Sequence, residues 1–187
     1  MSFLGEVLNS LYGAYRLARM DPHGLSFFNN TEEGFWNSFK AAAVILPLFL
    51  VLTAVRYTVD DIDSSLLRYF FIEMIAYVVG WVAFPVLIPR ICAQLQRTHH
   101  YMRFIIAYNW SAVLQNALYI PIVLFSITGL LPGGGGFFVL MAMIAIIVYS
   151  WFITKTALDI PGPVAAAIVV FDLFISFTIN MYAEALI

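Results

Sequence analysis

The sequence RICAQLQRTHHYMR, residues 90–103, decides the fold of this chain. It contains three arginines and two histidines but no acidic residue, and it lies between two segments that are too apolar for the core of a soluble domain. This pattern predicts a basic loop between two membrane spans. Short loops rich in Lys and Arg stay in the cytoplasm, because moving these residues across the bilayer during insertion is disfavoured. The loop therefore sets the expected orientation of the whole chain.

The overall composition is typical of an integral membrane protein. Of 187 residues, 63% are hydrophobic and 11% are charged, and the mean hydropathy is +0.91. A typical soluble domain has about 25% charged residues. No polar segment is long enough for a separate soluble domain. The single cysteine, Cys92, excludes an intramolecular disulfide, and we expect it to be a free thiol in a reducing compartment.

Apolar segments along the chain are expected to cross the membrane as helices. They cover residues 36–57, 66–89, 101–127, 137–156 and 164–187. Each has about 20 residues or more, which at about 1.5 Å per residue crosses a hydrocarbon core of about 30 Å. The sequence therefore predicts an all-α fold in which residues 32–187 form one five-helix transmembrane domain. Asn30 and Glu33 match a capping box before the first span, and Pro47 is expected to kink that span.

Residues 1–31 are predicted to form an amphipathic helix and a linker on the cytoplasmic side. The apolar stripe of this helix contains, at helical spacing, Leu4, Leu8, Leu11 and Tyr15. The helix is too polar to span. It either lies along the inner membrane surface, with Arg16 and Arg19 near anionic headgroups, or packs on the cytoplasmic ends of the spans.

The distribution of basic residues supports this topology. The positions expected inside are Arg16, Arg19, Lys40, Arg90, Arg97, Arg103 and Lys155. Those expected outside are Arg56 and Arg68, which flank the acidic residues Asp60, Asp61 and Asp63. A basic excess on one side indicates that the N-terminus is cytoplasmic and the C-terminus is outside. We expect the membrane to be the inner membrane of a bacterium.

Polar residues within the predicted spans mark a polar centre. Charged groups in a span are costly and usually face the bundle interior, so Glu73 and Asp172 need partners. Other spans supply polar side chains at helical spacing: Tyr108, Asn109, Ser111, Gln115 and Asn116 on the third, and Ser176 and Asn180 on the fifth. Counting about 1.5 Å per residue puts Asp172 level with Asn109, and Glu73 level with Gln115 and Asn116. We expect the second, third and fifth spans to enclose this centre, with the first and fourth packed outside.

Two interpretations of the polar centre remain open. In the first, amides hydrogen-bond the carboxyl groups in a structural core, each bond contributing about 0.6 to 2 kcal/mol. In the second, Glu73 and Asp172 belong to a pathway for a proton, a cation or a small polar solute. No basic residue lies at midplane depth to bind an anion, and no span has the paired Gly/Pro interruptions of large transporters. Both observations favour the structural interpretation.

Motifs for catalysis and metal binding are missing from the sequence. His99 and His100 are adjacent and would point apart on a helix, and no third ligand lies nearby in the sequence. The sequence also lacks a GxSxG, an HExxH and a Ser-His-Asp pattern. We therefore expect neither an enzyme nor a cofactor, and no feature indicates nucleic-acid binding.

The predicted layout resembles the Yip1-type membrane proteins, including their bacterial relatives. The likeness begins at Trp36 and rests locally on Ala107-Tyr108 with Pro121, and on Trp151 with KTAL at residues 155–158 before the small residues 165–167. The Asp-Leu-Tyr-Gly-Pro motif of eukaryotic members is missing, so a small-GTPase partner is not implied. The resemblance implies a non-catalytic protein of membrane organisation, trafficking or complex assembly, with the lipid bilayer and other membrane proteins as partners. The alternative is a small transporter or channel that uses Glu73 and Asp172.

Overall fold

The computed structural model describes residues 3–60 and 62–187, with side chains from residue 5 onward. The side chain of Leu4 and the whole of Asp61, both used in the sequence analysis, lie outside this description. The described elements, in chain order, are α1 (Phe3–Ala18), η1 (Pro22–Phe27), α2 (Glu32–Ser38), α3 (Lys40–Val59), α4 (Leu66–Gln94), η2 (Thr98–His100), α5 (Tyr101–Ile127), η3 (Pro132–Gly134), α6 (Gly136–Leu158) and α7 (Gly162–Leu186).

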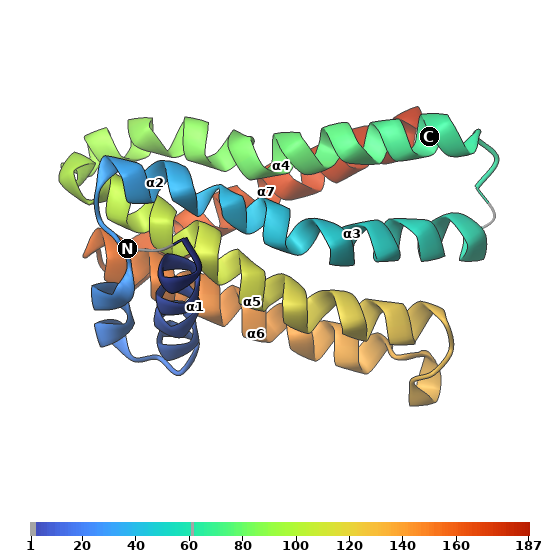
Figure 1. Cartoon of the computed structure of the whole chain (residues 1–187), viewed down its shortest axis with the longest axis horizontal. Coiled ribbons are helices and arrows are strands. Elements are labelled where there is room, and N and C mark those ends of the chain that lie inside the picture. The colour runs from blue at the N-terminus through green and yellow to red at the C-terminus, as the bar shows by residue number, and fades with distance from the viewer. Residues whose placement is uncertain (1–2, 61) are drawn as a thin grey trace.

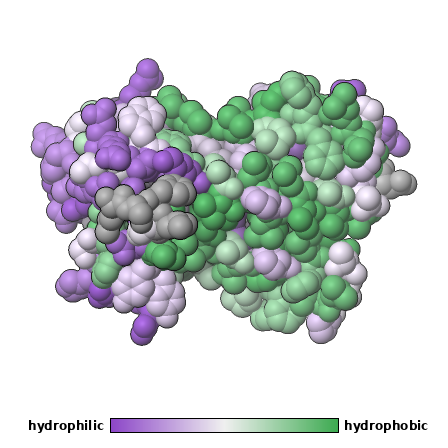
Figure 2. All heavy atoms as spheres, in the orientation of Figure 1, coloured by the Kyte–Doolittle hydropathy of each residue, from purple (hydrophilic) through white to green (hydrophobic). Residues whose placement is uncertain are grey.

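In the described part of the chain, five helical segments are long and apolar enough to cross a membrane, namely α2 with α3, α4, α5, α6 and α7. This confirms the all-α class and the five apolar segments predicted from the sequence. Figure 1 shows these helices side by side along the long axis of the molecule, with α1 across one end. We call the end that holds α1, η1 and η2 the basic end, and the end that holds the C-terminus the opposite end. Figure 2 shows hydrophilic residues gathered at the basic end and a largely hydrophobic surface over the rest of this face.

The spanning helices form a closed ring. Helix α5 packs against α3 and α6, α7 packs against α6 and α4, and α4 closes the ring against α3. Near the basic end α4 also approaches α5, where the Tyr101 hydroxyl donates to the Pro85 carbonyl at 2.9 Å. The prediction that the first and fourth spans pack outside a three-helix centre is wrong, because α3 and α6 are members of the ring. The physical reason is that three helices packed together leave little space between them, whereas a ring of five can enclose a cavity.

Helix α4 extends further toward the basic end than predicted. It ends at Gln94, so Arg90 and Cys92 belong to the helix and not to the loop. Pro85 and Pro89 lie inside it, and the Pro85 carbonyl, which Pro89 cannot bond, accepts from the Tyr101 hydroxyl instead. The Cys92 thiol is buried. The basic connection is therefore short, residues 95–100, and its second half is the single turn η2.

The start of the first spanning segment also differs from the prediction. Thr31, rather than Asn30, caps α2, and its hydroxyl accepts from the Gly34 amide at 3.1 Å. Thr31 has the extended backbone of an N-cap, and a side chain at Gly34 would collide with the Asn29 carbonyl. The helix is interrupted at Phe39, between α2 and α3, whereas Pro47 lies within α3.

The N-terminal hairpin, which we define as α1 with η1, packs on α5 and also contacts α6. Its buried residues include Ser10, Ala14 and Leu17, whereas Leu8 is 67% and Tyr15 is 50% exposed. Of the stripe predicted from the sequence, Leu11 thus packs against the core, whereas Leu8 and Tyr15 point away from it. Glycines lie where α1 and η1 come very close together, since a Cβ at Gly24 would lie 2.5 Å from the Gly13 carbonyl oxygen.

Replacing Leu17 by Asp is expected to release the hairpin from the bundle, because a carboxylate cannot be buried there without a partner. Limited proteolysis of the detergent-solubilised protein should then show new cleavage before Asn30. The matched control is Leu8→Asp, which changes an exposed leucine of the same helix and should leave the cleavage pattern unaltered. Equal sensitivity of the two variants would contradict this packing.

Candidate functional site

A cavity of about 360 Å³ lies inside the ring, and all five spanning helices contribute to its wall. The polar side chains that line it are Glu73, Tyr77, Tyr108, Gln115, Asn116, Ser150, Asp172, Ser176 and Asn180. The space is large enough for on the order of ten water molecules. The two carboxyl groups of the predicted polar centre therefore face a cavity that has polar groups in its wall and room for water.

The cavity runs along the helices for about two turns. On α4 its lining extends from Glu73 to Trp81, and on α7 from Asp172 to Asn180. Because α4 and α7 are antiparallel, Trp81 and Asp172 lie toward the basic end, and Glu73 and Asn180 lie toward the opposite end (Figure 1). Eight residues of helix separate the two levels, which is about 12 Å. The two carboxyl groups thus occupy different depths in one cavity.

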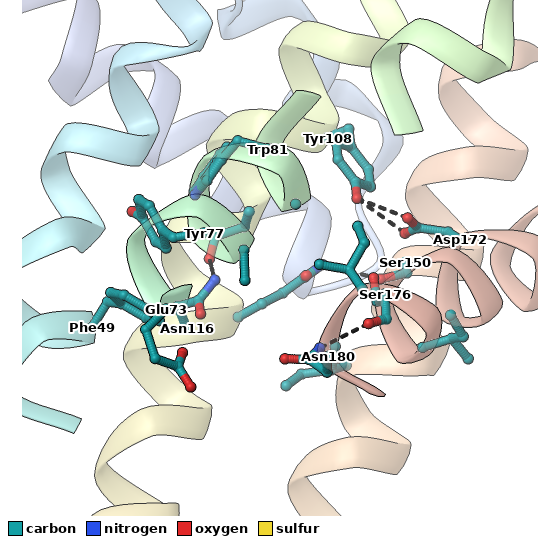
Figure 3. Close-up of a pocket in the computed structure, with 17 residues that line it drawn as sticks. Phe49, Glu73, Tyr77, Trp81, Tyr108, Asn116, Ser150, Asp172, Ser176 and Asn180 are labelled. Atoms are coloured by element: carbon teal, nitrogen blue, oxygen red, sulfur yellow. Dashed lines mark hydrogen bonds between the residues drawn. The ribbon is translucent and has the colours of Figure 1, made fainter. Parts of the chain in front are cut away.

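Among the described residues, Tyr108 is the one that hydrogen-bonds the Asp172 carboxyl group. The Tyr108 hydroxyl lies 3.0 Å and 3.1 Å from the two carboxylate oxygens, as Figure 3 shows. The ring of Tyr108 packs on Phe84, with the ring centroids 4.9 Å apart, so the phenol is fixed in place. This contact bridges α5 and α7 across the ring. The predicted pairing of Asp172 with Asn109 is wrong.

Asn109 and Ser111 are buried and point away from the cavity. The Asn109 side-chain amide donates to the Ser38 hydroxyl at 2.9 Å, which ties α5 to the end of α2. The Ser111 hydroxyl is hydrogen-bonded to the Tyr149 hydroxyl at 2.9 Å, and Tyr149 also bonds the Ala14 carbonyl of the hairpin at 2.7 Å. The polar residues predicted on α5 therefore divide into two sets. Tyr108, Gln115 and Asn116 line the cavity, while Asn109 and Ser111 hold neighbouring elements.

The amides in the cavity do not bond the carboxyl groups. Gln115 donates to the Ser150 hydroxyl at 3.1 Å. Asn116 and Asn180 each donate at 2.8 Å to a backbone carbonyl one turn earlier in their own helix. Glu73 accepts no hydrogen bond from any residue that the structure describes. Glu73 and Asp172 therefore keep free acceptor positions for water or a ligand, and Figure 3 shows them on different sides of the cavity.

The charge of the cavity is acidic. Its wall contains Glu73 and Asp172 but no Lys, Arg or His among the described residues. Arg56, at the opposite end, is engaged with Asp60 at 3.4 Å and lies 4.0 Å from Glu184. An anion would meet two carboxylates without a compensating cation, so the arrangement suits a proton, a cation or a neutral polar molecule.

At the basic end, the arginines form hydrogen bonds with carbonyl groups and an ion pair with an acidic side chain. Arg103 donates to the Ala157 carbonyl at 3.0 Å and 2.6 Å, and Arg97 donates to the Asp159 carbonyl at 3.1 Å. These bonds satisfy carbonyls at the C-terminus of α6. In the hairpin, Arg16 forms an ion pair with Asp21, and the Arg19 guanidinium lies 5.9 Å from the centre of the Tyr15 ring.

The histidines of the basic connection lie in contact. The ring centroids of His99 and His100 are 3.9 Å apart, so the prediction that they point apart is wrong, because they lie in a 3₁₀ turn and not in an α-helix. Within residues 3–60 and 62–187, no group of three His, Cys, Asp or Glu side chains is placed to hold a metal ion.

The aromatic part of the cavity wall was missed by the sequence analysis. Phe49, Tyr77 and Trp81 line the cavity from α3 and α4, and Ser150 lines it from α6. A signal was available, because Glu73, Tyr77 and Trp81 recur every four residues and therefore share one face of a helix. Ser150 had a weaker signal, as a small polar residue in a nearly continuous apolar helix.

Comparison with family models, with curated proteins and with solved structures finds no match for this chain.

Replacing Ser38 by Ala should destabilise the protein. The buried Asn109 amide would lose its acceptor, at a cost of about 1–3 kcal/mol in the free energy of unfolding. Thermal unfolding in detergent should show the loss as a lower Tm. Ser176→Ala removes a hydroxyl that faces the cavity and serves as the control with an unchanged Tm. If both variants have the Tm of the parent protein, the hydrogen bond between Asn109 of α5 and Ser38 of α2 does not contribute to stability.

Replacing Asp172 by Leu should change the Tm less than Ser38→Ala does. Tyr108 would lose its partner, but its hydroxyl can still bond water in the cavity. Removing the acidic group also removes the cost of keeping it at hydrocarbon depth, which offsets part of the loss in stability. The same thermal unfolding measurement compares the two variants. A larger loss of stability from Asp172→Leu would show that the carboxyl group belongs to a structural core.

Proposed function

We propose that the protein binds a small polar solute, a cation or a proton within the membrane and passes it across. The observation that carries this proposal is that Glu73 and Asp172 line one cavity about two helical turns apart and keep free acceptor positions. Ionisable groups at membrane depth most often mark a path for an ion or a solute. The role is one of binding and passage, without catalysis.

The hydrogen bonds favour this proposal over a structural polar core. In a structural core the amides of Gln115, Asn116 and Asn180 would bond the carboxyl groups. Instead they bond a serine hydroxyl or the backbone of their own helix. Two fully buried polar contacts between elements, Asn109 with Ser38 and Tyr149 with Ser111, lie outside the cavity.

The surface of the hairpin supports a position at the membrane surface. Leu8, Tyr12 and Tyr15 are exposed on α1, and Arg19 lies beside Tyr15. An apolar surface bordered by a cation fits the boundary between acyl chains and anionic headgroups. We place α1 there, with Arg19 toward headgroups and Arg16 held by Asp21. The same position is also compatible with the alternative function, that of a Yip1-like protein of membrane organisation. In that case the exposed surface of α1 would contact another membrane protein.

The proposed orientation puts the basic end in the cytoplasm of a bacterial cell and the C-terminus outside. The natural thiol cannot report this, because Cys92 is buried. In a Cys92→Ala background, Gln94→Cys should resist a membrane-impermeant maleimide in intact cells, and Asp63→Cys should react. Both positions are exposed, and both should react after lysis. The reverse pattern in intact cells would overturn the orientation.

Passage can be measured directly with purified protein in liposomes. We expect flux of protons, of inorganic cations or of small polar solutes above that of empty liposomes, and we expect Asp172→Asn to reduce it about tenfold or more, because the amide lacks the charge that attracts a cation and cannot exchange a proton. Glu33→Gln, an exposed acid on α2, is the control and should retain full flux. Absence of any flux, together with stoichiometric copurification of another membrane protein, would favour the organising role instead.

A further inference from the structure

One side of the cavity is a continuous aromatic wall. The ring centroids of Phe49 and Tyr77 are 4.4 Å apart, and those of Tyr77 and Trp81 are 6.2 Å apart. The Tyr77 hydroxyl donates to the Ala42 carbonyl at 2.6 Å, which fixes the ring between α4 and α3. Figure 3 shows Tyr77 and Trp81 from α4 on the side of the cavity away from Asp172.

We propose that this cavity binds a small organic ammonium ion, an inference that rests on the proposed function and names the class of its solute. The charged nitrogen lies near Asp172, and its alkyl groups lie against the rings of Trp81 and Tyr77. An ammonium group within about 6 Å of an aromatic centroid is attracted by the negative face of the ring, most strongly for Trp. The carboxylate on one side and the rings on the other together supply both parts of such a site.

Other classes of solute fit the wall less well. A bare metal cation requires several oxygen ligands at once, yet Glu73 and Asp172 lie about 12 Å apart along the helices. A neutral solute could donate hydrogen bonds to the carboxylates but would gain neither the charge attraction nor the cation–π contact with the rings. An anion would be repelled by both of them, and no basic residue of the described wall compensates. An organic ammonium ion is the class that uses the acids and the rings together.

Glu73 gives this site a second anionic position. It lies on the same face of α4 as Tyr77 and Trp81, toward the opposite end. A cation that leaves Asp172 in that direction passes along these two rings before it reaches Glu73. The aromatic wall therefore connects the two carboxylates, and an organic ammonium ion remains in contact with a ring or a carboxylate along this part of the cavity.

The test compares choline with its uncharged isostere 3,3-dimethylbutan-1-ol by isothermal titration calorimetry on the purified protein in nanodiscs. Choline should bind at least about tenfold more tightly than the isostere, because only the charge differs. Trp81→Leu should weaken choline binding about 10- to 30-fold, and Trp81→Phe, which keeps a ring, should weaken it less. Trp36→Leu, which removes an exposed tryptophan outside the cavity, is the control. Melting curves without ligand establish that each variant is folded.

The outcomes separate this inference from the proposed function. Equal binding of choline and the isostere, or choline binding that Trp81→Leu leaves unchanged, would overturn the organic ammonium site while solute binding stands. Flux of potassium or protons in liposomes without any binding of choline would do the same. Absence of binding for both probes, together with absence of flux for every ion and solute tested, would overturn the inference and the proposed function together.

Discussion

A carboxyl group at hydrocarbon depth must keep contact with water or with a hydrogen-bond donor, and the arrangement of this bundle follows from that constraint. Glu73 and Asp172 lie on different helices and at different depths, so one donor could not serve both. A ring of five helices provides a common cavity for them. Because the helices form a ring, α3 and α6 also contribute to the cavity wall. For the same reason α5 and α7 are joined across the cavity by the hydrogen bond from Tyr108 to Asp172.

The helices of the ring pack through buried apolar side chains, among them Ile88, Phe104 and Trp110, and polar contacts outside the cavity add to this packing. Asn109 bonds Ser38, and Tyr149 joins the hairpin to α5 and α6 through Ala14 and Ser111. At the basic end, Arg103 satisfies a carbonyl at the C-terminus of α6. At the opposite end, the Arg68 guanidinium donates to the Leu186 carbonyl of α7 at 2.8 Å. These polar contacts at the two ends and on the flank of the ring do not use Glu73, and they leave both carboxyl groups of the cavity with free acceptor positions.

Much of the fold follows from local sequence, whereas the contacts of the site depend on how the helices rotate. Length and hydropathy were sufficient to predict the five spanning segments, and helical spacing identified all the polar positions that line the cavity on α5 and α7. The same spacing could not separate Tyr108 from Asn109, because adjacent residues differ by about 100° around a helix and neighbouring helices decide which one faces inward. Depth counting matched Asp172 with Asn109 for this reason, although Asn109 faces α2.

The buried side of α1 in the hairpin could not be predicted from the sequence. Hydrophobic spacing predicts a stripe with Leu8 and Tyr15 that either the membrane surface or the spans would cover, and in the structure both are exposed, while Gly13 and Ala14 are in close contact with η1 and α6. Close approach of backbones requires small residues, and in a membrane protein large apolar residues are equally suited to lipid. Hydrophobic periodicity therefore finds a helix and its faces but does not tell which apolar face is buried in protein.

The reactivity of single cysteines in the Cys92→Ala protein tests most directly whether a hydrated cavity lies within the membrane. Ser176 lines the cavity, whereas Phe174, 66% exposed, lies two residues away and about 200° around the same helix. Thiol reagents of the methanethiosulfonate type react with the thiolate, which forms only where water reaches the group. The account predicts that Ser176→Cys reacts with the small ethylammonium reagent on the order of a hundredfold faster than Phe174→Cys, since the thiolate is disfavoured in hydrocarbon. Equal rates at the two positions would contradict it.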